Sequence, residues 1–277
     1  MLPGVSAGDR RADRSPLDLA AYLRRVGSAV EPSPSLAMVA ELVERHLAAI
    51  PFENLDVRLG REIQLDLAGL EAKLVRGGRG GYCFEQNTLF AAVLRAIGLE
   101  VTTLEARVRP PGATTTLPRT HMTLRAEIDG ASWLVDVGFG GDGPAVPVPL
   151  SGEPVEEAAG SCRVAPEGER LRVLQRQQGG GWTDLYAFTL DPALSVDFEV
   201  ASHFTATHPR SVFVQTLTVQ RTTPRARHVL RGRLYTRSGA SPDRREGLTD
   251  AEVHALLTGT FSLPVSAEEV GTALAGL

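Results

Sequence analysis

The stretch RGGYCFEQN, residues 79–87, holds one of only two cysteines in this chain of 277 residues. Two glycines precede Cys83, and a stretch with helical spacing of apolar residues follows it. At the first turn of a helix, backbone N–H groups lack partners within the helix, and the positive end of the helix dipole stabilises an anion. A thiolate there is a nucleophile, so Cys83 is a candidate for covalent catalysis. The alternative is a small buried residue that packs this helix against its neighbours.

A nucleophilic cysteine needs a base, and the chain offers six histidines. His46 lies within an amphipathic helix and is predicted to be structural or exposed. Of the others, His203 and His208 are predicted beside a loop, His228 at the start of a strand and His254 in the C-terminal helix. His121 differs from these because the sequence that follows it predicts its geometry.

His121 opens the stretch HMTLRAEI-DG-ASWLVDV, in which Asp129-Gly130 separates two alternating runs. This dipeptide between such runs predicts a β-hairpin with a two-residue turn. The turn pairs Ile128 with Ala131. The pairing continues outward as Ala126 with Trp133, Leu124 with Val135 and Met122 with Val137. Because all eight residues are apolar, one face of the hairpin is predicted to be core, and this fixes the register.

The opposite face of the same hairpin pairs Thr123 with Asp136 and sets His121 diagonally across from Asp136. Diagonal neighbours lie about 7–8 Å apart, within reach of an imidazole and a carboxylate. A charge between two valines needs a partner, so we predict a His121–Asp136 pair. Alternatively, Asp136 caps a loop or pairs with an arginine, and His121 lies at the surface. A carboxylate that orients an imidazole facing a thiol is the arrangement of a catalytic triad, here Cys83, His121 and Asp136.

The first third of the chain, which must position Cys83, is predicted to be helical. Ser15-Pro16 predicts a helix start, and the helical spacing that follows ends at Gly27. Further helices are predicted near 35–49, over 67–75 and from Cys83 to about Ile97.

After Gly98 the spacing of apolar residues changes from 3.6 to 2, which indicates strands. They are predicted at 101–109, 121–128, 132–139, 170–177, 182–189, 212–222 and 228–237. Thr249-x-x-Glu252 and Ser266-x-x-Glu269 are capping boxes that predict two closing helices. This order of elements favours an α+β fold.

The composition is typical of a globular protein, with 43% hydrophobic and 22% charged residues. The net charge of −4 gives no bulk attraction to nucleic acid or to anionic membranes, so neither is a predicted partner. No run of 18 apolar residues occurs, and the first residues lack the apolar stretch of a secretory signal. Cys83 and Cys162 are therefore predicted to be reduced thiols in a cytoplasmic protein. No metal is predicted, because the chain contains no HExxH or CxxC motif.

Four motifs together resemble the arylamine N-acetyltransferases: RGGYCFEQN, the upstream IPFENL, RTHMTL with His121, and LVDVGFGG with Asp136. They follow the family's order with similar spacing, and the resemblance runs from about residue 17 through the C-terminal helices. It implies an N-terminal helical bundle bearing the cysteine over 1–98, a central β-barrel bearing His and Asp over 99–200, and an α/β lid over 201–277. The helix-plus-barrel core is similar to that of the papain-like cysteine proteases.

The resemblance also implies a mechanism. Cys83 attacks the thioester of acetyl-CoA and holds the acetyl group, His121 takes the thiol proton, and Asp136 orients and stabilises the imidazolium. The nitrogen of an arylamine, hydrazine or arylhydroxylamine then accepts the acetyl group, which makes the kinetics ping-pong. The implied partners are thus a CoA thioester and a small aromatic amine or hydrazine, and a homo-oligomer is left open. No CoA-binding residue is predicted, because no local motif identifies one.

Aromatic residues are predicted to line the acceptor pocket. Phe52 in PFEN and Phe139 in VGFG match family positions that line it, and Phe213 in SVF is expected to join them. Aromatic walls suit a flat arylamine, although each ring could equally belong to the core. Gly138 and the other glycines of GFGG would let the loop after Asp136 approach a ligand closely. At position 86 this chain has Gln where many relatives have His, so a second proton relay is not implied.

Other activities fit parts of the sequence. GVSAG at 4–8 matches a serine-hydrolase nucleophile elbow, but without a preceding strand it is interpreted as a coincidence. Some relatives are amide synthases that release a polyketide chain from a carrier protein by forming a macrolactam, and the Arg-rich, Lys-poor composition fits the high-GC genomes in which such pathways occur. A thiol protease, an amidase and a non-catalytic binding protein are further alternatives. The presence of all three triad residues counts against the last.

Overall fold

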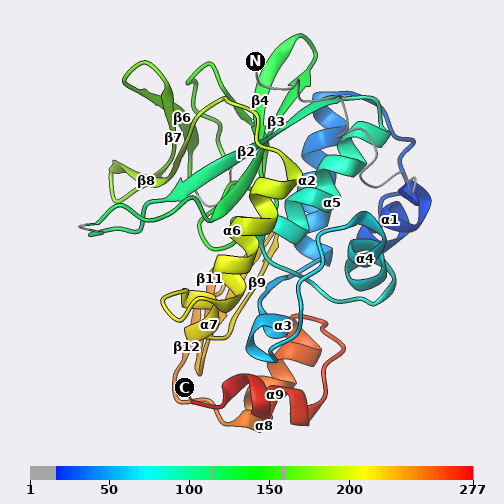
Figure 1. Ribbon diagram of the computed structural model, residues 1–277, viewed down its shortest axis with the longest axis vertical. Coiled ribbons are helices and arrows are strands. Elements are labelled where there is room, and N and C mark those ends of the chain that lie inside the picture. Colours follow the sequence, from blue (N-terminus) through cyan, green and yellow to red (C-terminus); the bar gives the residue numbers. More distant parts are fainter. Residues whose placement is uncertain (1–16, 114, 158–159, 277) are drawn as a thin grey trace, which may run out of the picture.

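The structure, a computed structural model, describes residues 17–113, 115–157 and 160–276. Helices from the first third of the chain pack beside an antiparallel sheet, drawn in green, while the C-terminal part adds a second sheet and its own helices (Figure 1). The α+β class predicted from the order of the elements is confirmed.

Capping side chains set the starts of the N-terminal helices. Ser35 caps α2 (Leu36–Ala49), which confirms the second predicted helix. The start predicted at Ser15-Pro16 lies outside the described residues. Within them, α1 (Leu19–Val26) begins where Asp18 Oδ1 accepts a hydrogen bond from the backbone N–H of Ala21 at 2.8 Å.

The other helical predictions hold with one irregularity. Helix α5 (Cys83–Ala96) begins at Cys83 as predicted. The helix predicted over 67–75 consists of α4 (Leu67–Leu70) followed by a π-helix, η1 (Glu71–Arg76). The short elements around IPFENL, β1 (Phe52–Glu53) and α3 (Leu55–Arg58), are missed because two to four residues carry no measurable periodicity.

The main sheet has seven antiparallel strands in the order β5-β4-β3-β2-β8-β7-β6. The strands are β2 (Glu100–Val108), β3 (His121–Ile128), β4 (Ala131–Val135), β5 (Val148–Pro149), β6 (Cys162–Glu167), β7 (Leu171–Gln178) and β8 (Gly181–Phe188). Its two end strands, β5 and β6, contact each other, so the sheet nearly closes into a barrel.

The β3–β4 hairpin has the predicted register. Ile128 pairs with Ala131, and the next two predicted pairs, 126 with 133 and 124 with 135, are also formed. The strand predicted over 132–139 is wrong beyond Val135. There the Asp136 carboxylate accepts a hydrogen bond from the backbone N–H of Gly138 at 2.8 Å and turns the chain out of the ladder. The pair predicted between Met122 and Val137 is therefore absent from the described ladder.

The second sheet has the order β1-β9-β10-β11-β12, so a strand from the N-terminal third completes a C-terminal sheet. Its C-terminal strands are β9 (Thr218–Thr223), β10 (Ala226–Arg231), β11 (Leu234–Gly239) and β12 (Asp243–Arg245). The single strand predicted over 228–237 is wrong, because a turn at Gly232, with φ +54°, divides it into β10 and β11.

The helices of the C-terminal part were predicted only in part. Helix α6 (Ser195–Thr207) includes His203, which corrects the prediction that this residue lies beside a loop. The strand predicted over 212–222 begins instead as a short helix, α7 (Val212–Gln215). Both capping boxes are confirmed at α8 (Asp250–Ala255), which continues as a π-helix over Leu256–Thr260, and at α9 (Ala267–Leu274).

Helix α5 lies at the centre of the largest apolar cluster. Its apolar residues pack with those of α1 and α2 and with the apolar face of the β3–β4 hairpin. The sheet supplies one further cluster and the C-terminal elements another. The position of Cys83 is thus fixed by burial of the helix that starts with it. The division at 98/99 and 200/201 stays a prediction, and α6 runs across the second position.

Candidate active site

Cys83 lies at the first turn of α5, where the sequence placed it. Its side chain is 3% exposed, and its Sγ lies 3.6 Å from the carbonyl oxygen of Thr120, the residue before strand β3. His121, the first residue of this strand, lies close enough to Cys83 for the thiol to raise the pKa of the imidazole. The helix start therefore points the sulfur at the first residue of the hairpin.

His121 and Asp136 form the predicted pair. His121 Nε2 lies 2.6 Å from Asp136 Oδ2, and both side chains are almost fully buried. Burial by itself would lower the pKa of His121, but the charge and hydrogen bond of Asp136, and then those of Cys83, raise this pKa to about 10. Since Nε2 is used by Asp136, the nitrogen left for Cys83 is Nδ1.

The Asp136 carboxylate is satisfied by four donors, of which sequence reasoning predicted one. Besides His121, Oδ2 accepts a hydrogen bond from the Tyr186 hydroxyl at 2.8 Å. Oδ1 accepts from Asn87 Nδ2 at 3.0 Å and from the backbone of Gly138 at 2.8 Å. Burial would raise the pKa of Asp136, but His121 and these side-chain hydrogen bonds hold it below its usual range. The carboxylate thus stays ionised in a buried site.

Gly138 is required by close packing. A Cβ at this position would lie 2.8 Å from Cys83 Cα and 2.7 Å from Asn87 Nδ2. The loop after Asp136 therefore passes directly over the start of α5, and only glycine leaves room for it.

The aromatic residues predicted for the acceptor pocket fall into two groups. The Phe139 ring lies edge-on to His121 at 5.2 Å between centroids. Phe52 and Phe213 contact each other at 5.6 Å, and Phe213 contacts Tyr82, which precedes Cys83, at 6.1 Å. Both groups adjoin triad residues, one at the imidazole and the other at the helix start.

A second buried histidine lies on the helical side of α5. His46 was predicted to be structural or exposed, and it is buried and structural. Its Nδ1 lies 3.0 Å from the Tyr22 hydroxyl, and its Nε2 lies 2.6 Å from Gln86 Oε1. Burial lowers the pKa of His46 to about 4, so the ring is neutral at physiological pH. Gln86 therefore binds a neutral histidine in the bundle and does not contribute a further base at the triad.

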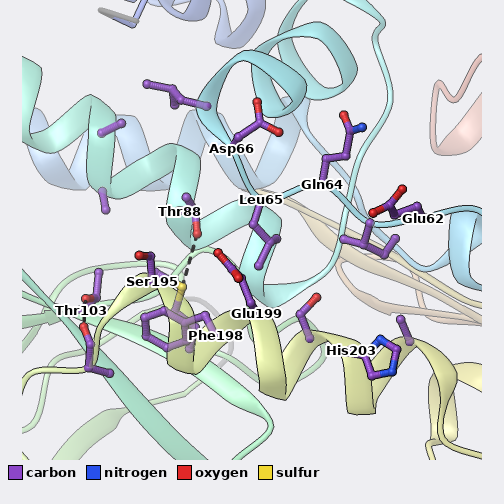
Figure 2. A pocket seen from close by; sticks show the side chains of 18 of the residues that line it. Glu62, Gln64, Leu65, Asp66, Thr88, Thr103, Ser195, Phe198, Glu199 and His203 are labelled. Carbon is purple, nitrogen blue, oxygen red and sulfur yellow. Dashed lines mark hydrogen bonds between the residues drawn. The ribbon is translucent and has the colours of Figure 1, made fainter. Parts of the chain in front are cut away.

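A large groove of about 1520 Å³ lies elsewhere, between α5, α6 and the segment 60–67 (Figure 2). Thr88, Phe198 and Leu65 line it, and the Thr88 hydroxyl donates to the sulfur of Met122 at 3.5 Å where helix and hairpin meet. The lining consists of residues other than the triad. Although this groove is large, Cys83, His121 and Asp136 do not line it.

Both cysteines are free thiols, as predicted. Burial raises the pKa of Cys162 to about 12, so this thiol stays protonated, and Cys83 alone has an imidazole beside it. In the part of the chain that the structure describes, no group of three or more His, Cys, Asp or Glu side chains is arranged to hold a metal ion. Within the same described ranges, none of the helices combines the length and apolar character needed to span a bilayer.

Chemically, the arrangement provides a nucleophile, a proton carrier and a fixed anion. An imidazole oriented by a buried carboxylate can take the thiol proton and stabilise the thiolate as it forms. Such a site can take an acyl group from an activated ester and pass it to a second nucleophile.

Comparison with known proteins identifies one family. A family model described as N-acetyltransferase matches residues 35–270. The arylamine N-acetyltransferase of Mycolicibacterium smegmatis is 42% identical over 235 residues, which is 81% of this chain and 84% of that protein. A Salmonella typhimurium protein named arylamine N-acetyltransferase / N-hydroxyarylamine O-acetyltransferase is 38% identical over 196 residues, covering 70% of this chain and 69% of its own.

Solved structures agree with this result. The arylamine N-acetyltransferase from Salmonella typhimurium superposes with a TM-score of 0.89 at 32% identity, over 94% of this chain and 98% of that one. The Mycobacterium marinum arylamine N-acetyltransferase in complex with CoA gives a TM-score of 0.86 at 33% identity, over 93% and 98%. The fold predicted from the resemblance, including its papain-like core, is confirmed.

Proposed function

Because the chain belongs to the arylamine N-acetyltransferase family, we propose that this acyltransferase moves an acetyl group from acetyl-CoA to the nitrogen of an arylamine, a hydrazine or an arylhydroxylamine. Cys83 holds the acetyl group as a thioester between two half-reactions. The observation that carries this proposal is the buried His121, which lies beside Cys83 and binds Asp136 through Nε2.

In the first half-reaction, Cys83 is the nucleophile, and His121 takes the proton of its thiol as the sulfur attacks. The sulfur bonds to the carbonyl carbon of the thioester, the bond from that carbon to the CoA sulfur breaks, and CoA takes the proton from His121. Asp136 stays ionised and keeps the ring oriented throughout.

The second half-reaction reverses the proton movement. The acceptor nitrogen attacks the acetyl carbon, neutral His121 takes a proton from that nitrogen, and Cys83 leaves as the thiolate. Each turnover moves one acetyl group, and the proton lost by the amine replaces the one carried away by CoA. Dividing the transfer into two steps through a covalent intermediate makes the kinetics ping-pong.

The aromatic residues support a flat acceptor. Phe139 packs against His121, which would take the acceptor's proton, while Phe52 and Phe213 lie beside Tyr82 at the helix start. We propose that these rings and the backbone at Gly138 line the acceptor site. The name of the Salmonella typhimurium relative includes O-acetylation of N-hydroxyarylamines, which supports arylhydroxylamines among the acceptors, with their oxygen as a further acceptor atom. The CoA complex of the Mycobacterium marinum relative supports a CoA donor.

The test is intact-protein mass spectrometry after mixing the enzyme with acetyl-CoA and no amine. We expect an acetyl adduct on the natural enzyme, discharged when an arylamine is added, and no adduct on Cys83→Ala. Turnover by Cys83→Ala close to that of the natural enzyme would remove Cys83 from its role.

A second outcome would redirect the proposal. If no adduct forms while Cys83 still reacts faster with iodoacetamide than a model thiol does, the thiol is activated but the donor is different. The amide-synthase reaction on a carrier-bound polyketide would then be the better hypothesis. We also propose a cytoplasmic location, which the two free thiols support.

A further inference from the structure

The turn that presents Cys83 is held from behind by five charged side chains, here called the rear cluster. These are Glu53, Asp56, Lys73, Arg79 and Glu85. Glu53 belongs to β1 and Asp56 to α3, Lys73 lies in the π-helix η1, Arg79 precedes α5, and Glu85 lies in its first turn. All five side chains are at most 19% exposed, so their ion pairs are poorly screened by solvent.

Lys73 joins two of the carboxylates. Its Nζ lies 2.6 Å from Glu85 Oε1 and 2.6 Å from Asp56 Oδ2. Lys73 is part of η1, and π-helical turns occur frequently at functional sites. Burial by itself would lower the pKa of Lys73, but the surrounding carboxylates raise it, so the cation stays charged in place.

Glu85 transmits this contact to the backbone next to Cys83. Its Oε2 accepts a hydrogen bond from the backbone N–H of Tyr82 at 3.0 Å. A Cβ on Gly81 would lie 2.6 Å from the same oxygen, so the backbone is wrapped closely around the carboxylate. The Glu85 carboxylate thus binds Lys73 through one oxygen and the backbone N–H of Tyr82 through the other.

Arg79 holds the beginning of the same turn and shares Asp56 with Lys73. Its guanidinium lies 2.8 Å from Glu53 Oε1 and 3.1 Å from Asp56 Oδ1. Among the described residues, Lys73 is the only cation within ion-pairing distance of Glu85. Loss of Lys73 would leave a carboxylate with 1% exposure next to Cys83 and without a counter-ion.

We propose that Lys73 and Glu85 are positioning residues for the nucleophile: their ion pair sets the Gly81–Tyr82 backbone from which Cys83 projects toward His121. The proposal rests on Cys83 being the nucleophile of the proposed function. A buried carboxylate deprived of its cation takes up a proton or draws in water, and its hydrogen bond to the Tyr82 N–H weakens. Burial already raises the pKa of Glu85 to about 7 against the opposing effect of Lys73, so the carboxylate depends on that cation.

The experiment compares Cys83 reactivity in Lys73→Met with that in the double variant Lys73→Met/Glu85→Gln. The measured quantity is the rate at which iodoacetamide alkylates Cys83, followed at the Cys83 peptide by mass spectrometry. The rate is normalised to the amount of folded protein. Lys73→Met is expected to slow alkylation about tenfold, since small displacements of reacting groups cost one to two orders of magnitude. The double variant is expected to recover to within about threefold, because the neutral amide oxygen can still accept the Tyr82 N–H without a cation.

Val270→Ala serves as the control for stability. Val270 is buried in the C-terminal apolar cluster, so the truncation lowers the melting temperature without touching the rear cluster. It is expected to leave the normalised alkylation rate unchanged. If Lys73→Met does not fold, Glu85→Gln alone tests the proposal. Its alkylation rate is expected to be about threefold lower than that of the natural protein. An unchanged rate would contradict the proposal.

Two results would overturn the proposal. One is a natural alkylation rate in Lys73→Met with only a lower melting temperature, which would make the ion pair purely structural. The other is a double variant as slow as the single one, which would place the effect in the lost lysine side chain itself. Alkylation needs no acyl donor, so a failure of acetyl-CoA to load the natural enzyme would contradict the proposed function and leave this comparison intact.

Discussion

Two buried histidines flank helix α5 and differ in protonation. His121, on the sheet side, has a pKa raised to about 10, whereas burial lowers the pKa of His46, on the helical side, to about 4. Both rings are nearly inaccessible to solvent, and both use Nε2 in a hydrogen bond of 2.6 Å. Adjacent residues of α5 serve the two sites, Gln86 for His46 and Asn87 for the carboxylate that binds His121.

Burial is common to both sites, so the charge of the partners decides the protonation state. A glutamine oxygen and a tyrosine hydroxyl offer His46 no charge that offsets the desolvation of an imidazolium. Asp136 does offer one, and its own ionisation is protected by donors on both oxygens. A proton carrier at this depth therefore requires an ionised partner that is itself fully hydrogen-bonded.

Removing that charge should make His121 resemble His46 and have the largest effect. Asp136→Asn is expected to bring the pKa of His121 below 6.5 and to reduce acetyl transfer about 10³- to 10⁴-fold, as loss of the carboxylate does in other triads. Single-turnover acyl loading and NMR titration of the imidazole would measure both effects.

Tyr186→Phe is the matched comparison for that variant, since it removes only one of the four hydrogen bonds to Asp136. A loss of about tenfold is expected, in line with the value of one hydrogen bond to a charged group. An Asp136→Asn enzyme that retains a His121 pKa near 10 would show that partner charge is not the cause of the difference between the two histidines.

The two histidines should also limit stability at opposite ends of the pH range. The pKa of His121 is raised on folding, so its contribution is fully present below about pH 6.5 and is lost as the pH rises toward 10. The pKa of His46 is lowered, so its contribution is present above about pH 6.5 and is lost as the pH falls toward 4. Each group adds a slope of up to about 1.4 kcal/mol per pH unit to the free energy of unfolding.

Urea unfolding across this pH range would separate the two contributions. His46→Gln should flatten the acid side relative to the natural protein, and Asp136→Asn should flatten the alkaline side. Because other groups titrate in the same range, the relevant quantity is the difference between variant and natural protein at each pH. A variant whose difference is constant with pH would contradict the assigned shift for its histidine.

Of the two histidine sites, the sequence predicted the one at His121, whose main partner lies close to it along the chain. Asp129-Gly130 and the alternation around it specify the hairpin register, and the register brings His121 and Asp136 together within 15 residues. Tyr186 was missed because β8 reaches the site only through the strand order β3-β2-β8, which the spacing of apolar residues does not contain.

The surroundings of His46 and two helical elements were not predicted, for related reasons. The environment of His46 depends on Gln86, 40 residues further along the chain, and no local pattern links them. Helix α6 lacks a clear amphipathic stripe and exposes Val196 and Val200, so its spacing did not indicate a helix. The π-helical turn that carries Lys73 has the same apolar spacing as an ordinary helix end, so it was predicted as one.

A charged partner added beside His46 tests the same explanation in the opposite direction. This variant has the smallest expected effect on activity. Gln86→Glu places a carboxylate on His46, but its second oxygen would face the carbonyls of Pro51 and Gly81, which the amide of Gln86 now donates to at 2.9 and 3.1 Å. The pKa of His46 should therefore rise above 4 yet stay well below that of His121, at a cost of about 2 kcal/mol in the free energy of unfolding. Acetyl transfer by the folded variant should stay within about threefold of natural, a change of about 0.7 kcal/mol, since the rear cluster and the triad are untouched. If NMR titration instead gave His46 a pKa near 10, a carboxylate alone would suffice to charge a buried histidine, and the donors around Asp136 would have another purpose.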